Sequence, residues 1–153
     1  FRRQKSKSKP QSDLGATDRA VNLVEDSVDC VLRVGPLADS AMVARRIGEL
    51  RFINVASPAY LARFGTPQSP ADLVGHQGVL FASPTTGRVE DWEWEEAGVL
   101  RRLAIPGRVT ANSAEAQIAC CLAGLGLIQI PAYDVRAHLA AGGCPVRSRW
   151  TEQ

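Results

Sequence analysis

The sequence predicts an α/β protein with a largely parallel sheet, and three observations support this class. Short apolar, β-branched segments alternate with amphipathic segments along most of the 153 residues. Strands separated by helices imply crossover connections, which favour parallel pairing. Ser-Pro helix starts and glycine stops separate the segments. The hydrophobic fraction is 45%, which is typical of a globular chain and too high for a disordered one.

The first half contains two predicted strands and two strongly marked helix starts. Thr17 or Asp18 can cap a helix, and residues 30–34 form a short apolar segment that indicates a buried strand. Residues 51–56 predict a second strand. The helix after it has Ser57 as N-cap, Pro58 at its first position and Gly65 as its stop. A shorter helix repeats the Ser-Pro start at residues 69–73.

The second half predicts five more strands and two more helices. Acidic and aromatic residues alternate over 91–95, which suits a strand with one solvated face, and residues 100–105 are its expected antiparallel partner. The strongest helix begins after Ser113 and ends before Gly124. The other expected elements are strands at 79–82, 109–111 and 127–130 and a final helix at 134–140.

Charge is distributed unevenly along the chain. There are 18 basic and 16 acidic residues, a net charge of +2, and five of the basic residues lie within the first ten positions. The remaining body therefore carries a small negative charge, which does not suit a nucleic-acid surface. Residues 1–12 are expected to be a solvated, disordered tail, although a KSKSK run could also contact phosphates or act as a localisation signal. Because no apolar run resembles a membrane span or signal peptide, a cytoplasmic location is expected.

Motifs for catalysis or metal binding are weak. His76 and His138 lack metal-ligand spacing and are interpreted as satisfied surface histidines. Adjacent Cys120 and Cys121 point about 100° apart on a helix, so they and Cys30 are interpreted as small core residues. The clustered acids at 90–96 are interpreted as a solvated face. We therefore expect no enzyme activity, no cofactor and no metal.

Helix N-termini are the features that favour ligand binding. Ser57 and Ser113 each begin a helix directly after a strand, where free N–H groups and the helix dipole attract anions. Ligands of open parallel sheets lie outside the carboxyl ends of the strands. Arg33, at the end of a predicted strand, could add a positive charge, so a small carboxylate is the expected ligand. The alternative is that both serines only cap their helices.

Three stretches together resemble one protein family. DRAVNLVEDSVDCVLRVG, at 18–35, is similar to the DR-x-V-D-L-V-E-x-G-x-D-x-x-I-R-x-G segment of LysR-type transcriptional regulators. ARRIGELRFINVASPAYLARFGTPQSPADLVGH resembles the centre of that family's effector domain. NSAEAQIACCLAGLGLIQIPAYDVRAHLAAG resembles its later helix, glycine turn, strand and proline. The resemblance covers residues 13–143.

The resemblance implies a two-lobed effector domain of the type 2 periplasmic-binding-protein fold, with mixed, mainly parallel sheets. Residues 13–46 would form an incomplete lobe one and residues 47–146 lobe two, followed by a tail at 147–153. The family's N-terminal winged helix-turn-helix is missing from this sequence. A small inducer would bind between the lobes, and DNA would be bound only through that missing domain. The family also pairs as homodimers or tetramers, partly through the helix at 114–123.

Carrying the family pattern over residue by residue gives a set of expected effector-binding positions. Those from lobe one lie at a helix start and near a strand end, and those from lobe two follow strands: Thr17, Asp18, Arg33, Ser57, Phe81, Ser83, Asn112, Ser113 and Ala114. The implied function is effector binding that modulates transcription. The alternative of the same fold is a free-standing solute-binding protein, for which a secretory signal would be the distinguishing feature.

Overall fold

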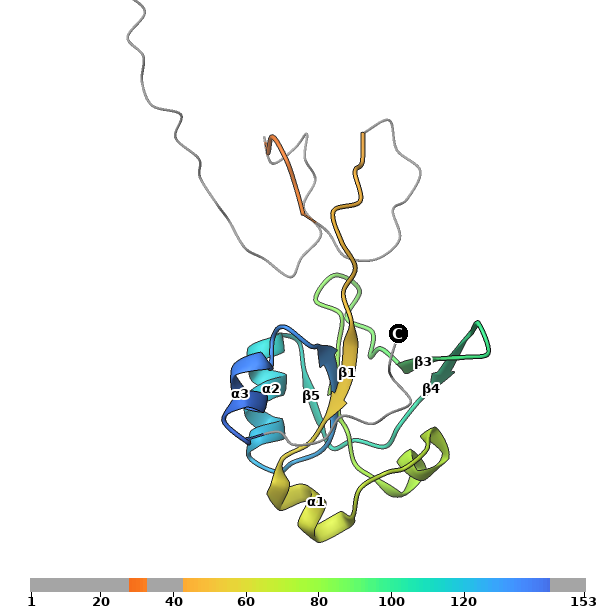
Figure 1. The fold of residues 1–153 in the computed structure, drawn as a ribbon, viewed down its shortest axis with the longest axis vertical. Helices are drawn as coiled ribbons and strands as arrows, with labels where there is room; N and C mark the ends of the chain where they lie inside the picture. The colour runs from red at the N-terminus through yellow and green to blue at the C-terminus, as the bar shows by residue number, and fades with distance from the viewer. Residues whose placement is uncertain (1–27, 33–42, 144–153) are drawn as a thin grey trace, which may run out of the picture.

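The computed structural model describes residues 28–32 and 43–143 (Figure 1). The helix predicted after Thr17 or Asp18 and the basic segment at 1–12 lie outside the described residues. The elements, in chain order, are β1 (Phe52–Val55), α1 (Pro58–Phe64), the 3-10 helix η1 (Pro70–Gly75), β2 (Val79–Phe81), β3 (Trp92–Glu96), β4 (Val99–Leu103), β5 (Val109–Ala111), α2 (Ala114–Leu122), β6 (Ile128–Pro131) and α3 (Arg136–Ala140).

The strands at the centre join into one mixed sheet. β1 pairs antiparallel with β6, and β2 pairs parallel with β5. A parallel bridge between Gly78 and Leu127 connects these two pairs, so that the order across the sheet is β1, β6, β2, β5. Two of its three junctions are therefore parallel, in agreement with a mixed, mainly parallel sheet. The predicted antiparallel insertion is confirmed as the β3–β4 hairpin, which projects to one side in Figure 1.

Alternating side chains of β1 and β6 divide the core into two parts. Ile53 and Val55 of β1, with Ile128 and Ile130 of β6, face the side that α2 and α3 cover (Figure 1). Successive side chains of a strand point to opposite faces, so residues two positions apart share one face of the sheet. Val135, just before α3, closes this first cluster and is fully buried. The apolar pattern of the sequence thus determines which face receives the helices.

The second core cluster lies on the other face, where α1 and the hairpin meet the sheet. Tyr60, Leu73, Trp92 and Leu127 are its largest buried members. The Tyr60 hydroxyl accepts a hydrogen bond from the Gln77 N–H at 2.8 Å and lies 3.2 Å from Nδ1 of His76. This hydroxyl therefore connects α1 to the end of η1.

Both serine-started helices form as the sequence predicts. The Ser57 side chain accepts from the Tyr60 N–H, Pro58 takes the first turn of α1, and Gly65 ends it with a φ of 82°. Ser113 caps α2 through the Ala116 N–H in the same way. A short polar side chain that replaces the missing backbone partner explains why these boundaries can be read from the sequence.

Three expectations are corrected. The segment at 30–34 is expected to be a buried strand, but its described residues, 30–32, form no strand, and Cys30 is exposed. No other described strand pairs with it, so its β-branched residues have no ladder to join. His76 was expected at the surface, but it is buried, because η1 turns its ring against Tyr60. The helix at 69–73 is a 3-10 turn.

Among the described residues, every helix is too short, or not apolar enough, to cross a membrane.

We expect Gly126→Ala to destabilise the fold by about 1–3 kcal/mol, because an added Cβ would lie 2.6 Å from the Gln77 carbonyl oxygen and 2.9 Å from the Gly78 carbonyl carbon. Backbone atoms cannot move aside as a flexible side chain can. Chemical denaturation measures the loss. The matched control is Gly75→Ala, whose Cβ meets nothing within 4 Å and which should change stability by less than about 1 kcal/mol. Equal effects of the two substitutions would contradict this account of Gly126.

We expect stability to fall as the pH drops through about 6.5, the ordinary pKa of histidine. Burial lowers the pKa of His76, against a smaller opposing effect of Asp72. The unfolded chain therefore binds a proton at a higher pH than the folded chain, and acid favours unfolding. Unfolding curves between pH 7.5 and 5.5 measure this slope. His76→Gln should flatten the slope and His138→Gln should retain it, whereas an unchanged slope in His76→Gln would show that another group is responsible.

Candidate ligand-binding cleft

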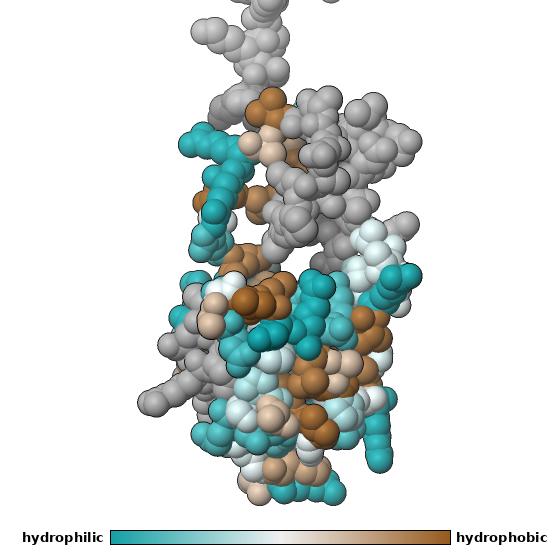
Figure 2. Space-filling view, turned by 90° about the vertical axis from the view of Figure 1, so that its right-hand side faces the viewer, coloured by the Kyte–Doolittle hydropathy of each residue, from teal (hydrophilic) through white to brown (hydrophobic). Residues whose placement is uncertain are grey.

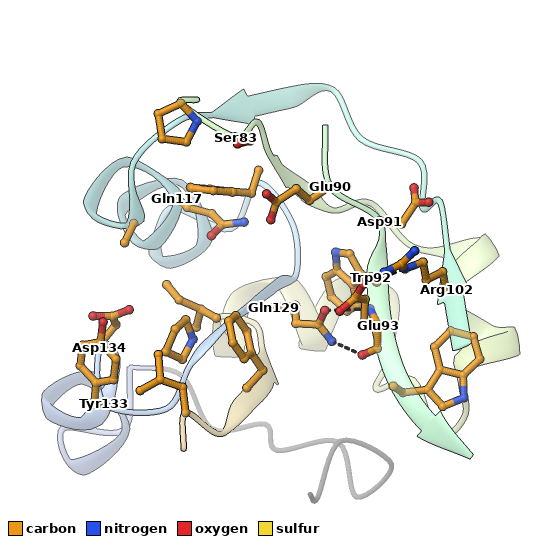
Figure 3. A pocket seen from close by; sticks show the side chains of 18 of the residues that line it. Ser83, Glu90, Asp91, Trp92, Glu93, Arg102, Gln117, Gln129, Tyr133 and Asp134 are labelled. Atoms are coloured by element: carbon orange, nitrogen blue, oxygen red, sulfur yellow. Dashed lines mark hydrogen bonds and ion pairs between the residues drawn. The ribbon is translucent and has the colours of Figure 1, made fainter. Parts of the chain in front are cut away.

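A cleft of about 980 Å³ lies at one end of the central sheet, between the β3–β4 hairpin and the first turn of α2 (Figure 3). Its volume is at the upper end of the range for small-molecule sites. Its walls come from the start of β1, the end of β2, the hairpin, α2 and the end of β6. Among the lining residues are Phe52, Phe81, Ser83, Trp92, Trp94, Ala114, Gln117, Ile130, Pro131 and Tyr133.

The position of the cleft follows from strand direction. β2 and β6 run parallel, so their carboxyl ends, at Phe81 and Pro131, open on the same edge of the sheet. Side chains that follow such strands converge there, which is the usual ligand position in open α/β sheets. β1 runs the opposite way and contributes its first residue, Phe52.

The side chain of Gln129 attaches the hairpin to the sheet. Oε1 of Gln129 accepts from the Glu93 N–H at 2.9 Å, and its Nε2 donates to the Glu93 carbonyl at 2.7 Å. The same Nε2 lies 3.1 Å from Oδ1 of the buried Asn54. The glutamine amide thus imitates the backbone of a neighbouring strand. Trp92, 4% exposed, packs beside this attachment and places its indole at the cleft (Figure 3).

Charge on the described walls is mostly negative. The acidic residues that line the cleft are Glu90, Asp91, Glu93, Glu115 and Asp134. Arg102 is the one basic residue among the lining residues, and its Nε lies 2.7 Å from a Glu93 carboxylate oxygen. Because both side chains of this pair are about half exposed or more, it contributes little to stability. Figure 2 views the molecule from the hairpin side and shows hydrophilic residues interspersed with hydrophobic ones.

The structure brings together some of the predicted site residues. Phe81, Ser83 and Ala114 line the cleft. Ser113 lies next to Ala114 as the cap of α2, and Asn112 is an exposed residue just before it. These five predicted site residues therefore lie at the cleft or next to it. Thr17, Asp18 and Arg33 lie outside the described residues.

Ser57 was expected at the effector site, but it does not line this cleft. It is 2% exposed and caps α1 at the carboxyl end of β1. Since β1 is antiparallel to β6, that end lies at the opposite edge of the sheet from Pro131. The expectation applied the parallel-strand rule to a strand that runs the other way, so the interpretation that Ser57 only caps its helix describes its contacts.

Several lining residues were not predicted as site residues. Glu90 is held beside the end of β2, because its N–H donates to the Phe81 carbonyl at 2.8 Å. Gln117 is 3% exposed on α2, and its Nε2 donates to the Val79 carbonyl at 2.9 Å. A buried amide inside an Ala- and Cys-rich helix was the available signal for Gln117. Trp92 and Tyr133 carried no local signal, because only the tertiary fold brings the hairpin and the loop after β6 together.

Within the part of the chain that the structure describes, His, Cys, Asp and Glu form no cluster that could hold a metal ion. Cys121 is buried with its sulfur 3.7 Å from the Val55 carbonyl oxygen, as expected for a core residue, and Cys120 is half-buried beside it. The geometry of the cleft is that of non-covalent recognition: an open α/β sheet whose strand ends, aromatic rings and polar side chains surround a cavity of ligand size. These features are typical of small-molecule-binding domains.

Comparison with known proteins places the chain in a family. The model of the LysR substrate binding domain matches residues 1–148, and the chain belongs to this family. It is 43% identical over 132 residues to the uncharacterized HTH-type transcriptional regulator YhjC of Escherichia coli K12, covering 85% of this chain and 44% of that protein. It is 37% identical over 133 residues to the HTH-type transcriptional regulator CrgA of Neisseria meningitidis serogroup B, covering 84% of this chain and 42% of the relative.

Solved structures of LysR-type regulators also match this chain. The structure of CrgA, described as a LysR-type transcriptional regulator from Neisseria meningitidis, matches with a TM-score of 0.71 at 35% identity, over 86% of this chain and 44% of that one. Its separate regulatory domain matches with a TM-score of 0.69 at 33% identity, over 85% of this chain and 63% of that one. The chain thus has the type 2 periplasmic-binding-protein-like fold of these regulatory domains. It spans less than half the length of the two curated relatives named above.

We expect Gln129→Leu to lower stability by about 2 kcal/mol and to speed amide exchange in β3, because it removes the two hydrogen bonds to Glu93 of the hairpin and a third to Asn54 of β1. Hydrogen exchange of the Glu93 amide is the direct measurement. Arg102→Gln is the control, since it breaks a half-exposed pair on the same hairpin and should change stability by less than about 1 kcal/mol. If the Glu93 amide exchanged at the wild-type rate in Gln129→Leu, the proposed attachment would be wrong.

Proposed function

We propose that this chain is the effector-binding part of a LysR-type transcriptional regulator and that a small organic molecule binds in the cleft between β2, β6, α2 and the hairpin. The observation that carries this proposal is the cleft itself, which lies at the carboxyl ends of the parallel strands in a domain of that family. In this proposal residues 13–46 contribute to lobe one and residues 47–146 form lobe two.

The mechanism we propose is a shift between arrangements of the two lobes. An effector that binds one arrangement more tightly than the other raises its population, and the size of the shift equals the difference in binding free energy. In the whole regulator this change would alter how a DNA-binding domain is presented. DNA contact would come from that domain, because the described residues of this chain hold no basic surface comparable to a recognition helix.

Location and assembly complete the proposal. The relatives are named as HTH-type transcriptional regulators. These names support a cytoplasmic, non-catalytic protein that regulates transcription through DNA binding. They give no support to a free-standing solute-binding protein. A homodimer or tetramer of the full-length protein is proposed through the outer face of α2. Ile118, Ala119 and Leu122 line a shallow groove there with His138 of α3, and Leu122 is 36% exposed.

Thermal unfolding of this chain with a panel of small organic compounds tests the site. A ligand that binds only the folded chain should raise the stability by about 2.7 kcal/mol at a hundredfold excess over its Kd. Ser83→Trp should abolish the stabilisation, because a large ring at this half-buried lining position would fill part of the cleft.

The control variant is Ala62→Trp, which places the same ring at an exposed position of α1 that does not line the cleft. It should keep the full response to the compound. A stabilisation that persists in Ser83→Trp would show that the compound binds elsewhere and would contradict the proposed site.

A further inference from the structure

We infer that the group of the effector that faces this cleft is a positively charged nitrogen, such as a protonated amine, joined to an apolar or aromatic body. This inference rests on the proposed function, since it assigns the ligand chemistry of the same cleft. It replaces the expectation of a carboxylate ligand for the walls that the structure describes. Three independent features of those walls carry it.

The first feature is a hydrogen-bond acceptor of Gln117 at the cleft. The residue is only 3% exposed, and the Val79 carbonyl fixes the orientation of its amide by accepting from Nε2 at 2.9 Å. An amide whose nitrogen must face a carbonyl has its oxygen directed away from it. No described residue donates a hydrogen bond to this Oε1. Among the described residues, the buried side-chain atoms without a partner do not include this oxygen, so it is an acceptor on the cleft lining that the donor of a ligand can reach.

The second feature is the charge around this acceptor. Glu90 lies on the same side of the cleft as Gln117 in Figure 3, held there by its backbone bond to Phe81. Asp91 follows it, and the charge of Arg102 is already engaged by Glu93. A cleft with walls of one sign concentrates ligands of the opposite sign. A carboxylate entering here would meet like charges instead.

The helix N-terminus does not reverse this balance. The first turn of α2 contains Glu115, so a carboxylate of the chain itself already lies at the positive end of the helix dipole. The Ser113 hydroxyl accepts one of the free N–H groups, that of Ala116, at 3.3 Å. An anionic ligand would therefore compete with groups that the chain supplies.

The third feature is the aromatic surface beside the acids. The indole of Trp92 lies beside Gln129, in the middle of the view in Figure 3. Cations are attracted to the faces of aromatic rings; because Trp92 is only 4% exposed, the half-buried Trp94 is the more accessible indole of the lining. Phe81 and Tyr133 add further rings to the lining. Acceptors and carboxylates beside aromatic rings form an environment suited to an organic ammonium group.

Matched probes with one skeleton test the inference: 2-phenylethylamine, 2-phenylethanol and 3-phenylpropionate. Binding to this chain is followed by calorimetry and by the indole N–H signals of Trp92 and Trp94, which both line the cleft. We expect the amine to bind about tenfold more tightly than the acid, with the alcohol between them, and this preference should shrink as salt is added.

Two variants locate the effect. Glu90→Gln removes one negative charge from the lining and should weaken amine binding about threefold or more. Glu95→Gln removes the same charge from an exposed position of β3 that does not line the cleft, and should change it less than twofold. Gln117→Leu, similar in size, should also weaken the amine by losing the acceptor. Because Glu90 is exposed, its variant remains informative even if Gln117→Leu is unstable.

The outcomes separate the inference from the function. If the acid binds as tightly as the amine or more tightly, or if Glu90→Gln and Glu95→Gln act equally, the inference is overturned while the effector site stands. If none of the three probes perturbs the indole signals, the inference also fails, and the proposed function is then judged by the broader thermal panel with its Ser83→Trp control. Amine preference that is lost in Glu90→Gln and kept in Glu95→Gln supports it.

Discussion

The rest of the structure depends on one close parallel contact, between the segment at the start of β2 (residues 77–79) and Leu127, just before β6. The Val79 N–H donates to the Leu127 carbonyl at 2.8 Å, and the Leu127 N–H donates to the Gln77 carbonyl at 2.9 Å. Gly126 lies where the two segments meet, and a Cβ there would be 2.6 Å from the Gln77 carbonyl oxygen. This contact joins the two strand pairs into one sheet and aligns the strand ends that form the cleft. Helices, hairpin and site are all positioned relative to it.

The local features of this fold are largely predictable from the sequence. Ser57, Pro58 and Gly65 mark α1 because each acts through its own backbone and its nearest neighbours, and Ser113 marks α2 in the same way. The alternation around Trp92 predicts one buried face, and the structure buries that indole. Such signals need no knowledge of the rest of the chain.

The features that sequence reasoning misplaced are those that depend on strand direction or on a distant partner. Ser57 has the correct local role but lies at the other edge of the sheet, because nothing in residues 52–55 states that β1 runs antiparallel to β6. His76 is buried because Tyr60, sixteen positions earlier, supplies its partner. Gln117 and Glu90 belong to one cleft only after β2, α2 and the loop before β3 are brought together. The family resemblance supplies the fold but does not place these side chains in one cleft.

The amide of Gln129 has a consequence for how such a domain can diversify. The hairpin is attached to the sheet by a side chain and a buried indole rather than by a continuous ladder of backbone hydrogen bonds. Its remaining residues can therefore be exchanged, lengthened or shortened while the sheet keeps its register. A wall of the cleft can change its chemistry without a change of scaffold, so that one architecture can serve many chemical signals.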